Sequence, residues 1–152
     1  LVGPNGAGKT TPIRMMVGLT RPDRGNVAVL GRWVWPDPAP VKDDIGVLPD
    51  DLRLFERLTG RELLTYLGLL RGIDRDVVDS RTGDLLVTLG LDDDADTLVA
   101  DYSTGMRKKV ALAAAILHAP RVLFLDEPFE SVDPISSRTI TEVLTALSLI
   151  HI

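Results

Sequence analysis

Several features that define other classes of protein are absent from this sequence. It contains no cysteine, which excludes a disulfide framework and a thiolate metal site and suits a reducing compartment. Basic residues are outnumbered, with 17 Lys and Arg against 22 Asp and Glu and a net charge of −5, so we expect no nucleic-acid partner. The longest apolar run, residues 110–117, is far shorter than the roughly 20 residues of a membrane-spanning helix.

What is present indicates one folded domain, which we predict to occupy residues 1–152. The length of 152 residues is close to that of a typical domain, and 45% of the residues are hydrophobic while 26% are charged. Residues 147–152 are interpreted as translated sequencing adapter rather than native chain. The alternative is an ordinary helix end, because Leu144 and Leu147 continue a helical stripe.

Hydrophobic periodicity and capping residues predict an α/β fold. We expect a helix over residues 10–19 and buried strands over residues 27–30, 45–48 and 122–125. The remaining helices each have a polar N-cap, and they are predicted to begin at Thr59, Asp74, Ser103 and Asp133. In the second of these, Val77 and Val78 are expected to face inward.

Residues 3–10, Gly-Pro-Asn-Gly-Ala-Gly-Lys-Thr, fit the pattern G-x-x-x-x-G-K-[ST] of a phosphate-binding loop. Its glycines let backbone N–H groups surround an anion, and the helix N-terminus adds its positive dipole end. In such a loop Lys9 would reach the β and γ phosphates, Thr10 would coordinate Mg²⁺ and Thr11 would donate to the α phosphate. The alternative is a glycine-rich turn that happens to precede a helix.

Two adjacent acids follow the apolar run at residues 122–125. Asp126 is placed to reach Mg²⁺ through water, and Glu127 could accept a proton from the attacking water. The alternative is a strand exit with solvated acids. A phosphate loop earlier in the same chain favours the catalytic interpretation.

Residues 102–109 place three cations, Arg107, Lys108 and Lys109, near the start of a predicted helix, where the helix dipole disfavours positive charge. We therefore expect a compensating anion. The γ-phosphate of a second molecule, held by Ser103 and the helix N-terminus, would supply it and would imply a sandwich of two nucleotide domains. The alternative is an amphipathic helix with a basic outer edge.

Together these motifs resemble the nucleotide-binding domain of ATP-binding cassette (ABC) transporters. The resemblance extends to about residue 146, with Walker A at residues 3–11, the signature at 102–106, Walker B at 122–127 and the D-loop at 131–133. It implies a P-loop NTPase fold with a RecA-like core and parallel sheet in residues 1–50 and 119–146. An inserted α-helical subdomain would occupy about residues 51–118.

The resemblance also implies ATP and Mg²⁺ as cofactors. It makes Glu127 the base and Lys9 a catalytic cation, with Thr10 and Asp126 as metal ligands. The residues implied to contact nucleotide are Gly3, Asn5, Gly6, Ala7, Gly8, Lys9, Thr10 and Thr11, together with Ser103 and Gly105 from the signature.

The sequence departs from the family pattern at several positions. Asp50 stands where the family usually has Gln, and because a carboxylate can also bind Mg²⁺, we predict that Asp50 is a metal-binding and catalytic residue. Thr104 and Met106 replace Gly and Gln of the signature, a variant that resembles exporter-type ATPases. The adenine-stacking aromatic and the switch His are absent, and His151 comes too early. We therefore expect a chain truncated at both ends and inactive alone.

The resulting hypothesis is an ATP-hydrolysing subunit that powers transport of a substrate across a membrane. It would pair with a second nucleotide-binding domain and a transmembrane permease subunit, and would lie in the cytoplasm at the inner face of the membrane. The alternative is a non-transport ABC-type ATPase, a mechanical switch in DNA repair or translation. The short segment between Asp50 and the signature favours transport, because the alternative class usually carries long insertions.

Overall fold

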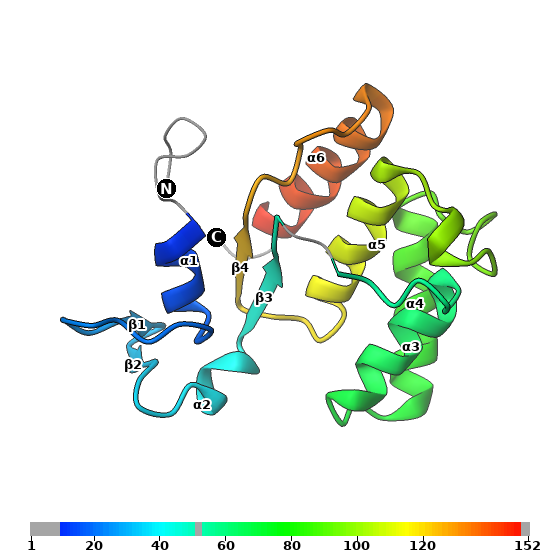
Figure 1. Ribbon diagram of the computed structural model, residues 1–152. Coiled ribbons are helices and arrows are strands. Elements are labelled where there is room, and N and C mark those ends of the chain that lie inside the picture. The colour runs from blue at the N-terminus through cyan, green and yellow to red at the C-terminus, as the bar shows by residue number, and fades with distance from the viewer. Residues whose placement is uncertain (1–9, 51–52, 150–152) are drawn as a thin grey trace.

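The computed structural model describes residues 10–50 and 53–149 (Figure 1). Strands β3 and β4 lie in the middle, with α1 on one side, α5 and α6 on the other, and α3 and α4 beyond α5 (Figure 1). No helix in this described part is long and apolar enough to cross a membrane. In chain order the elements are α1 (Thr10–Met16), β1 (Ala28–Val29), β2 (Arg32–Trp33), α2 (Ala39–Lys42), β3 (Ile45–Leu48), α3 (Gly60–Leu70), α4 (Arg75–Thr88), a 3-10 turn (Val99–Asp101), α5 (Thr104–Ile116), β4 (Val122–Leu125) and α6 (Pro134–Leu149).

Strands β3 and β4 form a parallel pair, in register from Ile45 opposite Val122 to Leu48 opposite Leu125. Apolar side chains leave β4 on both faces, as is typical of parallel sheets with covered faces. Val122 and Phe124 pack toward α1, while Leu123 and Leu125 pack toward α5 and α6. The predicted strands at residues 45–48 and 122–125 are thus confirmed, although all four β4 residues are only half-buried.

The contact between β3 and α5 depends on the absence of a side chain at Gly46. A Cβ on this residue would overlap the backbone carbonyl oxygen of Ala115 and would lie 2.8 Å from a methyl carbon of Leu123. The backbone of α5 therefore rests directly on β3. This close approach positions the helix that begins at the signature segment.

Local signals set the boundaries of the helices. Thr59 opens α3 with a full capping box, because its side chain accepts from the Glu62 N–H and Glu62 in turn accepts from the Thr59 N–H. Asp74 and Ser103 cap α4 and α5 with their side chains alone, each accepting from a backbone N–H of the first turn. The predicted starts of these helices are confirmed.

One apolar cluster in the described part joins the helical segment to the rest of the fold. Its buried members include Leu63 of α3, Leu86 of α4, Leu112 of α5 and Ile140 of α6. Helices α3, α4 and α5 share this cluster with α6, which belongs to the predicted core. The separation into core and helical subdomain therefore stays a prediction. Helix α6 continues to Leu149 and packs Leu147 against it, and the adapter interpretation of residues 147–152 is likewise untested.

Two expectations were wrong. A buried strand over residues 27–30 does not form; β1 is shorter and pairs antiparallel with β2. The reason is that Leu30 and Gly31 both have positive φ, 52° and 75°, the combination that closes a two-residue hairpin loop. Val77 faces outward, with 40% of its surface exposed, because the buried stripe of α4 runs through Val78 and Leu86.

Candidate active site

The predicted phosphate loop lies mostly outside the described residues. The loop residues that lie outside the described part of the chain are Gly3, Asn5, Gly6, Ala7, Gly8 and Lys9. A helix, α1, is present from Thr10, as the motif requires, and Thr11 is exposed on its first turn. The side of the site formed by β3, β4 and α5 can be described directly.

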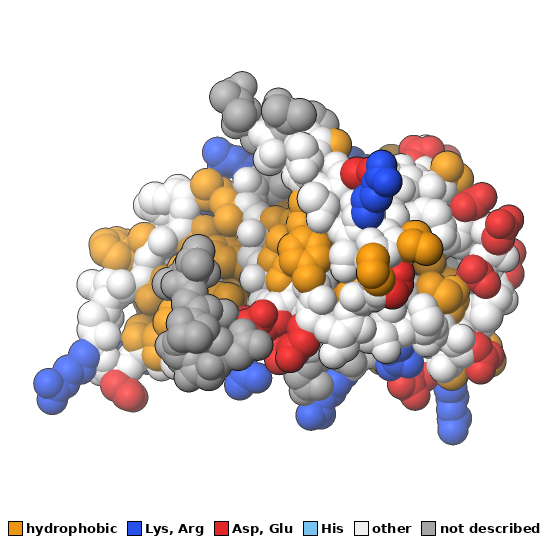
Figure 2. Space-filling view, turned by 90° about the horizontal axis from the view of Figure 1, so that it is seen from above, with side chains coloured by type: hydrophobic (Ala, Val, Ile, Leu, Met, Phe, Trp, Pro, Cys, Tyr) orange, Lys and Arg blue, Asp and Glu red, His pale blue; other side chains and the backbone are white. Residues whose placement is uncertain are grey.

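Asp126 and Asp50 are brought together by the parallel pairing of their strands. Each follows the carboxyl end of its strand, and the Asp126 N–H donates to the Leu48 carbonyl at 2.9 Å, which extends the pairing past β4. Asp126 is buried at 5% exposure and Asp50 is exposed, and both line a cavity of about 430 Å³ that α1 also borders. From above, acidic side chains lie near the middle of this face, beside hydrophobic ones (Figure 2).

The two carboxylates fit a magnesium ion. Mg²⁺ is usually held by one or two carboxylates together with waters and substrate phosphates, and does not need an all-protein cage. Residues 10–50 and 53–149 contain no cluster of three or more His, Cys, Asp or Glu that could hold a metal by itself.

Glu127 occupies an unusual backbone conformation. Its φ is +48°, a left-handed value that costs a residue other than glycine about 1–3 kcal/mol. Its carbonyl accepts two hydrogen bonds, from the Glu130 N–H at 3.2 Å and from Lys108 Nζ at 3.0 Å. Both hydrogen bonds, one of them from a charged ammonium, hold the residue in this conformation against the strain.

The signature segment serves the fold as well as the predicted site. Ser103 Oγ accepts from the Met106 N–H at 3.2 Å, yet the side chain is exposed and its hydroxyl hydrogen remains a possible donor to an anion. Gly105 is buried, and a Cβ there would overlap Ser136 and lie 2.5 Å from an Asp133 carboxylate oxygen. The signature thus packs directly against the start of α6.

Asp133, in the predicted D-loop, is the cap of α6. Its carboxylate accepts from the Ser136 N–H at 2.9 Å. This hydrogen bond, followed by one to the Ser136 side chain, lowers the pKa of Asp133 below its ordinary value. The ionised carboxylate thus ties the end of the predicted D-loop to the first turn of α6.

Comparison with known proteins identifies this arrangement. The family model described as ABC transporter matches residues 1–130. The chain belongs to the ABC transporter family. It is 40% identical to the daunorubicin/doxorubicin resistance ATP-binding protein DrrA of Streptomyces peucetius, with 97% of this chain and 44% of that protein covered.

Two further proteins show the same relationship. The linearmycin resistance ATP-binding protein LnrL of Bacillus subtilis is 35% identical, with 97% of this chain and 48% of LnrL covered. A solved structure of the ATP-binding subunit of an ABC transporter superposes with a TM-score of 0.83 at 29% identity, covering 96% of this chain and 61% of that one. The chain spans about half the length of these curated relatives.

Within this ABC domain, the three cations after the signature have separate environments. Arg107 pairs with Glu56 at 2.6 Å and donates to the Val99 carbonyl, so its compensating anion comes from the same chain. Lys108 donates to Glu127. Lys109 is buried, and its Nζ lies 4.0 Å from the position that a Cβ on Gly90 would take. Its neighbour therefore differs from those of Arg107 and Lys108. Glu56 is thus the compensating anion for Arg107, and the phosphate expected at Ser103 stays a prediction.

A second cavity, of about 260 Å³, is bordered by Asp50, by the signature segment and by the predicted D-loop. Its lining residues are Asp50, Thr104, Arg107, Lys108, Glu130 and Ser131. Asp50 therefore lines both this cavity and the 430 Å³ cavity that it shares with Asp126. The sequence analysis named Lys108 as a cation near the helix start but did not predict its contact with Glu127, because the two residues are 19 positions apart and no local pattern links them.

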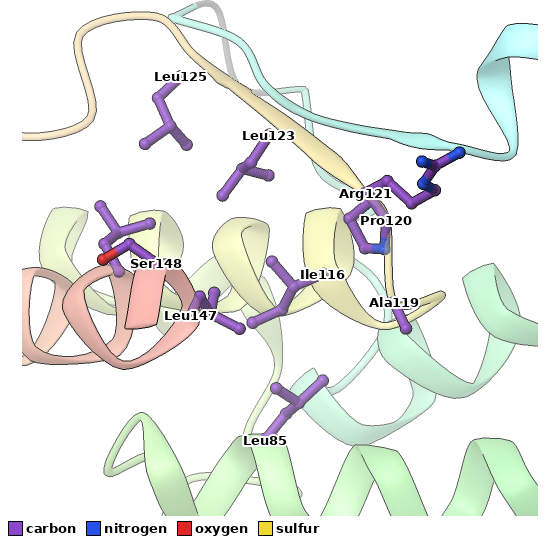
Figure 3. A pocket seen from close by; sticks show the side chains of 10 residues that line it. Leu85, Ile116, Ala119, Pro120, Arg121, Leu123, Leu125, Leu147 and Ser148 are labelled. Atoms are coloured by element: carbon purple, nitrogen blue, oxygen red, sulfur yellow. The ribbon is translucent and has the colours of Figure 1, made fainter. Parts of the chain in front are cut away.

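A third cavity, of about 600 Å³, is not part of this site. It lies below β4 and is lined mainly by apolar side chains of β4, α4, α5 and α6, including Leu85, Ile116, Leu123 and Leu147 (Figure 3). None of its lining residues belongs to the predicted nucleotide-contacting or metal-binding set.

Proposed function

We propose that this chain is the nucleotide-binding part of an ATP-hydrolysing subunit of an ABC exporter. The observation that carries the proposal is the convergence of Asp126, Glu127 and Asp50 at the carboxyl ends of β3 and β4, in a chain with a phosphate-loop sequence. The relatives named for resistance to linearmycin and to daunorubicin and doxorubicin support export as the direction of transport.

In this proposal each motif contacts a different part of ATP. Backbone N–H groups of the loop around Gly6 and Gly8 hold the phosphates, Lys9 neutralises their charge and Thr11 donates to the α phosphate. Thr10, Asp126 and Asp50 hold Mg²⁺, which supplies charge neutralisation at the phosphates when bound.

Glu127 accepts the proton of the attacking water in the same proposal. Ser103 and Gly105 face a nucleotide held by a second nucleotide-binding domain, so the complete site needs two domains. A transmembrane permease subunit is the other partner, and the domain lies on the cytoplasmic side of the membrane. The exposed pair Phe55 and Tyr66, with ring centroids 5.5 Å apart, supports a protein contact on the helical part.

The test separates binding from hydrolysis with two substitutions. Lys9→Ala should weaken ATP binding about 10- to 100-fold, because a charge-assisted contact to phosphate is lost, whereas Lys42→Ala on exposed α2 should not. Glu127→Gln should keep ATP binding and lower hydrolysis by about 10²-fold or more in an active assembly of the subunit. Calorimetry measures the first effect and phosphate release the second. Full affinity in Lys9→Ala, or full hydrolysis in Glu127→Gln, would contradict the proposal.

A further inference from the structure

Lys108 is a buried cation whose partner is the backbone of the hydrolytic acid. It lies on α5, two residues after the signature, with 5% of its surface exposed. Its Nζ donates to the Glu127 carbonyl oxygen at 3.0 Å. Burying an ammonium group costs free energy unless a hydrogen-bond acceptor is present, and this contact supplies the acceptor.

We propose that Lys108 is a positioning residue for hydrolysis: its ammonium holds the Glu127 carbonyl and thereby fixes the direction in which the Glu127 carboxylate leaves the turn. The inference rests on the proposed function, in which Glu127 is the base. It goes beyond that function by assigning a role to a residue outside the nucleotide-contacting and metal-binding sets.

The geometry of the turn explains why such a tie matters. Glu127 has φ +48°, and its carbonyl also accepts a hydrogen bond from the Glu130 N–H, three residues later in the same turn. That local bond closes the turn but does not attach it to the rest of the molecule. Lys108 attaches it to α5, an element that β3 and the apolar cluster hold in place.

The contact also joins the signature to the acid within one chain. Ser103 caps α5 five residues before Lys108, and both Lys108 and Thr104 line the cavity that Asp50 and Ser131 share. A displacement of the signature end of α5 therefore reaches Glu127 through a single hydrogen bond. Arg107 and Lys109 on the same helix have other neighbours, which makes Lys109 a matched control.

Three variants of the 152-residue chain test the proposal. Lys108→Met removes the donor and keeps the buried stem, Lys108→Arg keeps a donor, and Lys109→Met changes an adjacent buried lysine. The local probe is the Glu127 carbonyl: Glu127 is the only glutamate followed by proline in the sequence, so ¹³C-carbonyl glutamate with ¹⁵N-proline labelling gives one coupled pair. ATP affinity and ATP hydrolysis are measured on the same samples.

We expect Lys108→Met to shift the Glu127 carbonyl resonance upfield and to slow hydrolysis about tenfold or more, because a small misplacement of a catalytic group is costly. ATP affinity should stay within about twofold, since binding does not need the base. Lys108→Arg should restore most of the rate, and Lys109→Met should change neither readout. Where the unaltered chain binds ATP without measurable hydrolysis, the readout is the ATP-induced shift of this resonance, which should be lost in Lys108→Met.

The outcomes separate this proposal from the proposed function. Absence of ATP binding by the unaltered chain overturns both. Normal ATP binding with an unshifted carbonyl in Lys108→Met overturns the role of Lys108 alone. A persisting ATP-induced shift in Lys108→Met also overturns it, because the carbonyl would then respond to ATP without the lysine. Equal losses in Lys108→Met and Lys109→Met overturn it as well, because the effect would then be one of general packing.

Discussion

Gly105 shows how a motif residue can be required by packing. The sequence places it in the signature, where the family resemblance implies a contact with nucleotide. The structure adds that its missing side chain leaves room for Asp133 and Ser136 of the D-loop and α6. This second reason depends on two segments 28 residues apart in sequence, and no local pattern could have predicted it.

Substituting Gly105 should therefore destabilise the fold. Gly105→Ala places a Cβ into Ser136, and such overpacking costs about 1–3 kcal/mol. Gly83→Ala is the matched control, because Gly83 lies within α4 with open space at its Cβ position. Replacing a helical glycine by alanine should stabilise the fold by about 0.5–1 kcal/mol. Urea denaturation measures both, and a Gly105→Ala midpoint at or above that of the original chain would contradict the packing argument.

At the scale of elements, the sequence predicted helix starts better than strands. The caps at Thr59, Asp74 and Ser103 act on N–H groups two or three residues away, so the signal is local and readable. The hairpin at β1 and β2 depended instead on Leu30 adopting a positive φ, which its side chain disfavours. The contact of Lys108 with Glu127 was not predicted for a similar reason, since that partner is supplied by a distant turn.

The capping box of α3 gives a prediction for this scale. Thr59→Ala removes the acceptor for the Glu62 N–H, now at 3.2 Å, and should lower the free energy of unfolding by about 1 kcal/mol. Thr59→Ser keeps the hydroxyl and should cost much less. Thermal and urea unfolding of the two variants check this. Equal losses would mean that the methyl group, and not the cap, stabilises the helix start.

At the scale of the whole molecule, pairing of two parallel strands assembles the described half of the site. Their carboxyl ends meet at one edge, which brings Asp50 to the same cavity as Asp126 across an interval of 76 residues. The motifs and their order predicted this convergence through the family resemblance. They could not predict the distances, the burial or the cavity that Asp50 shares with the signature, because these depend on how α5 packs.

His118 links stability to pH at the junction of α5 and β3. Its Nε2 lies 2.9 Å from the Ile45 carbonyl, and the buried Nδ1 has no hydrogen-bond partner among residues 10–50 and 53–149, so a neutral ring that donates from Nε2 fits the site. Burial, and secondarily the charges of Arg71 and Arg81, lower the pKa of His118 below 6.5, while the Ile45 contact and Asp43 oppose this. The unfolded chain then binds more protons, so stability should fall as the pH drops below about 6.5.

The pH effect can be isolated by one substitution. His118→Gln keeps an amide donor for Ile45 and does not titrate, so it should lose less stability than the original chain between pH 7.5 and pH 5.5. Urea midpoints at the two pH values give the comparison. Identical pH dependence in the two proteins would show that carboxylates alone govern acid stability.

The direct contact of Gly46 with the Ala115 backbone makes a pivot. No layer of flexible side chains separates strand from helix at this point, so α5 can tilt about it but cannot easily slide. Ala115 is near one end of α5 and Ser103 caps the other, a lever arm of roughly 18 Å at 1.5 Å per residue. A tilt of about 10° would thus move Ser103 by about 3 Å while leaving the pivot almost in place. Because Gly105 at that end packs directly against Asp133 and Ser136, such a tilt would carry the start of α6 along with the signature segment.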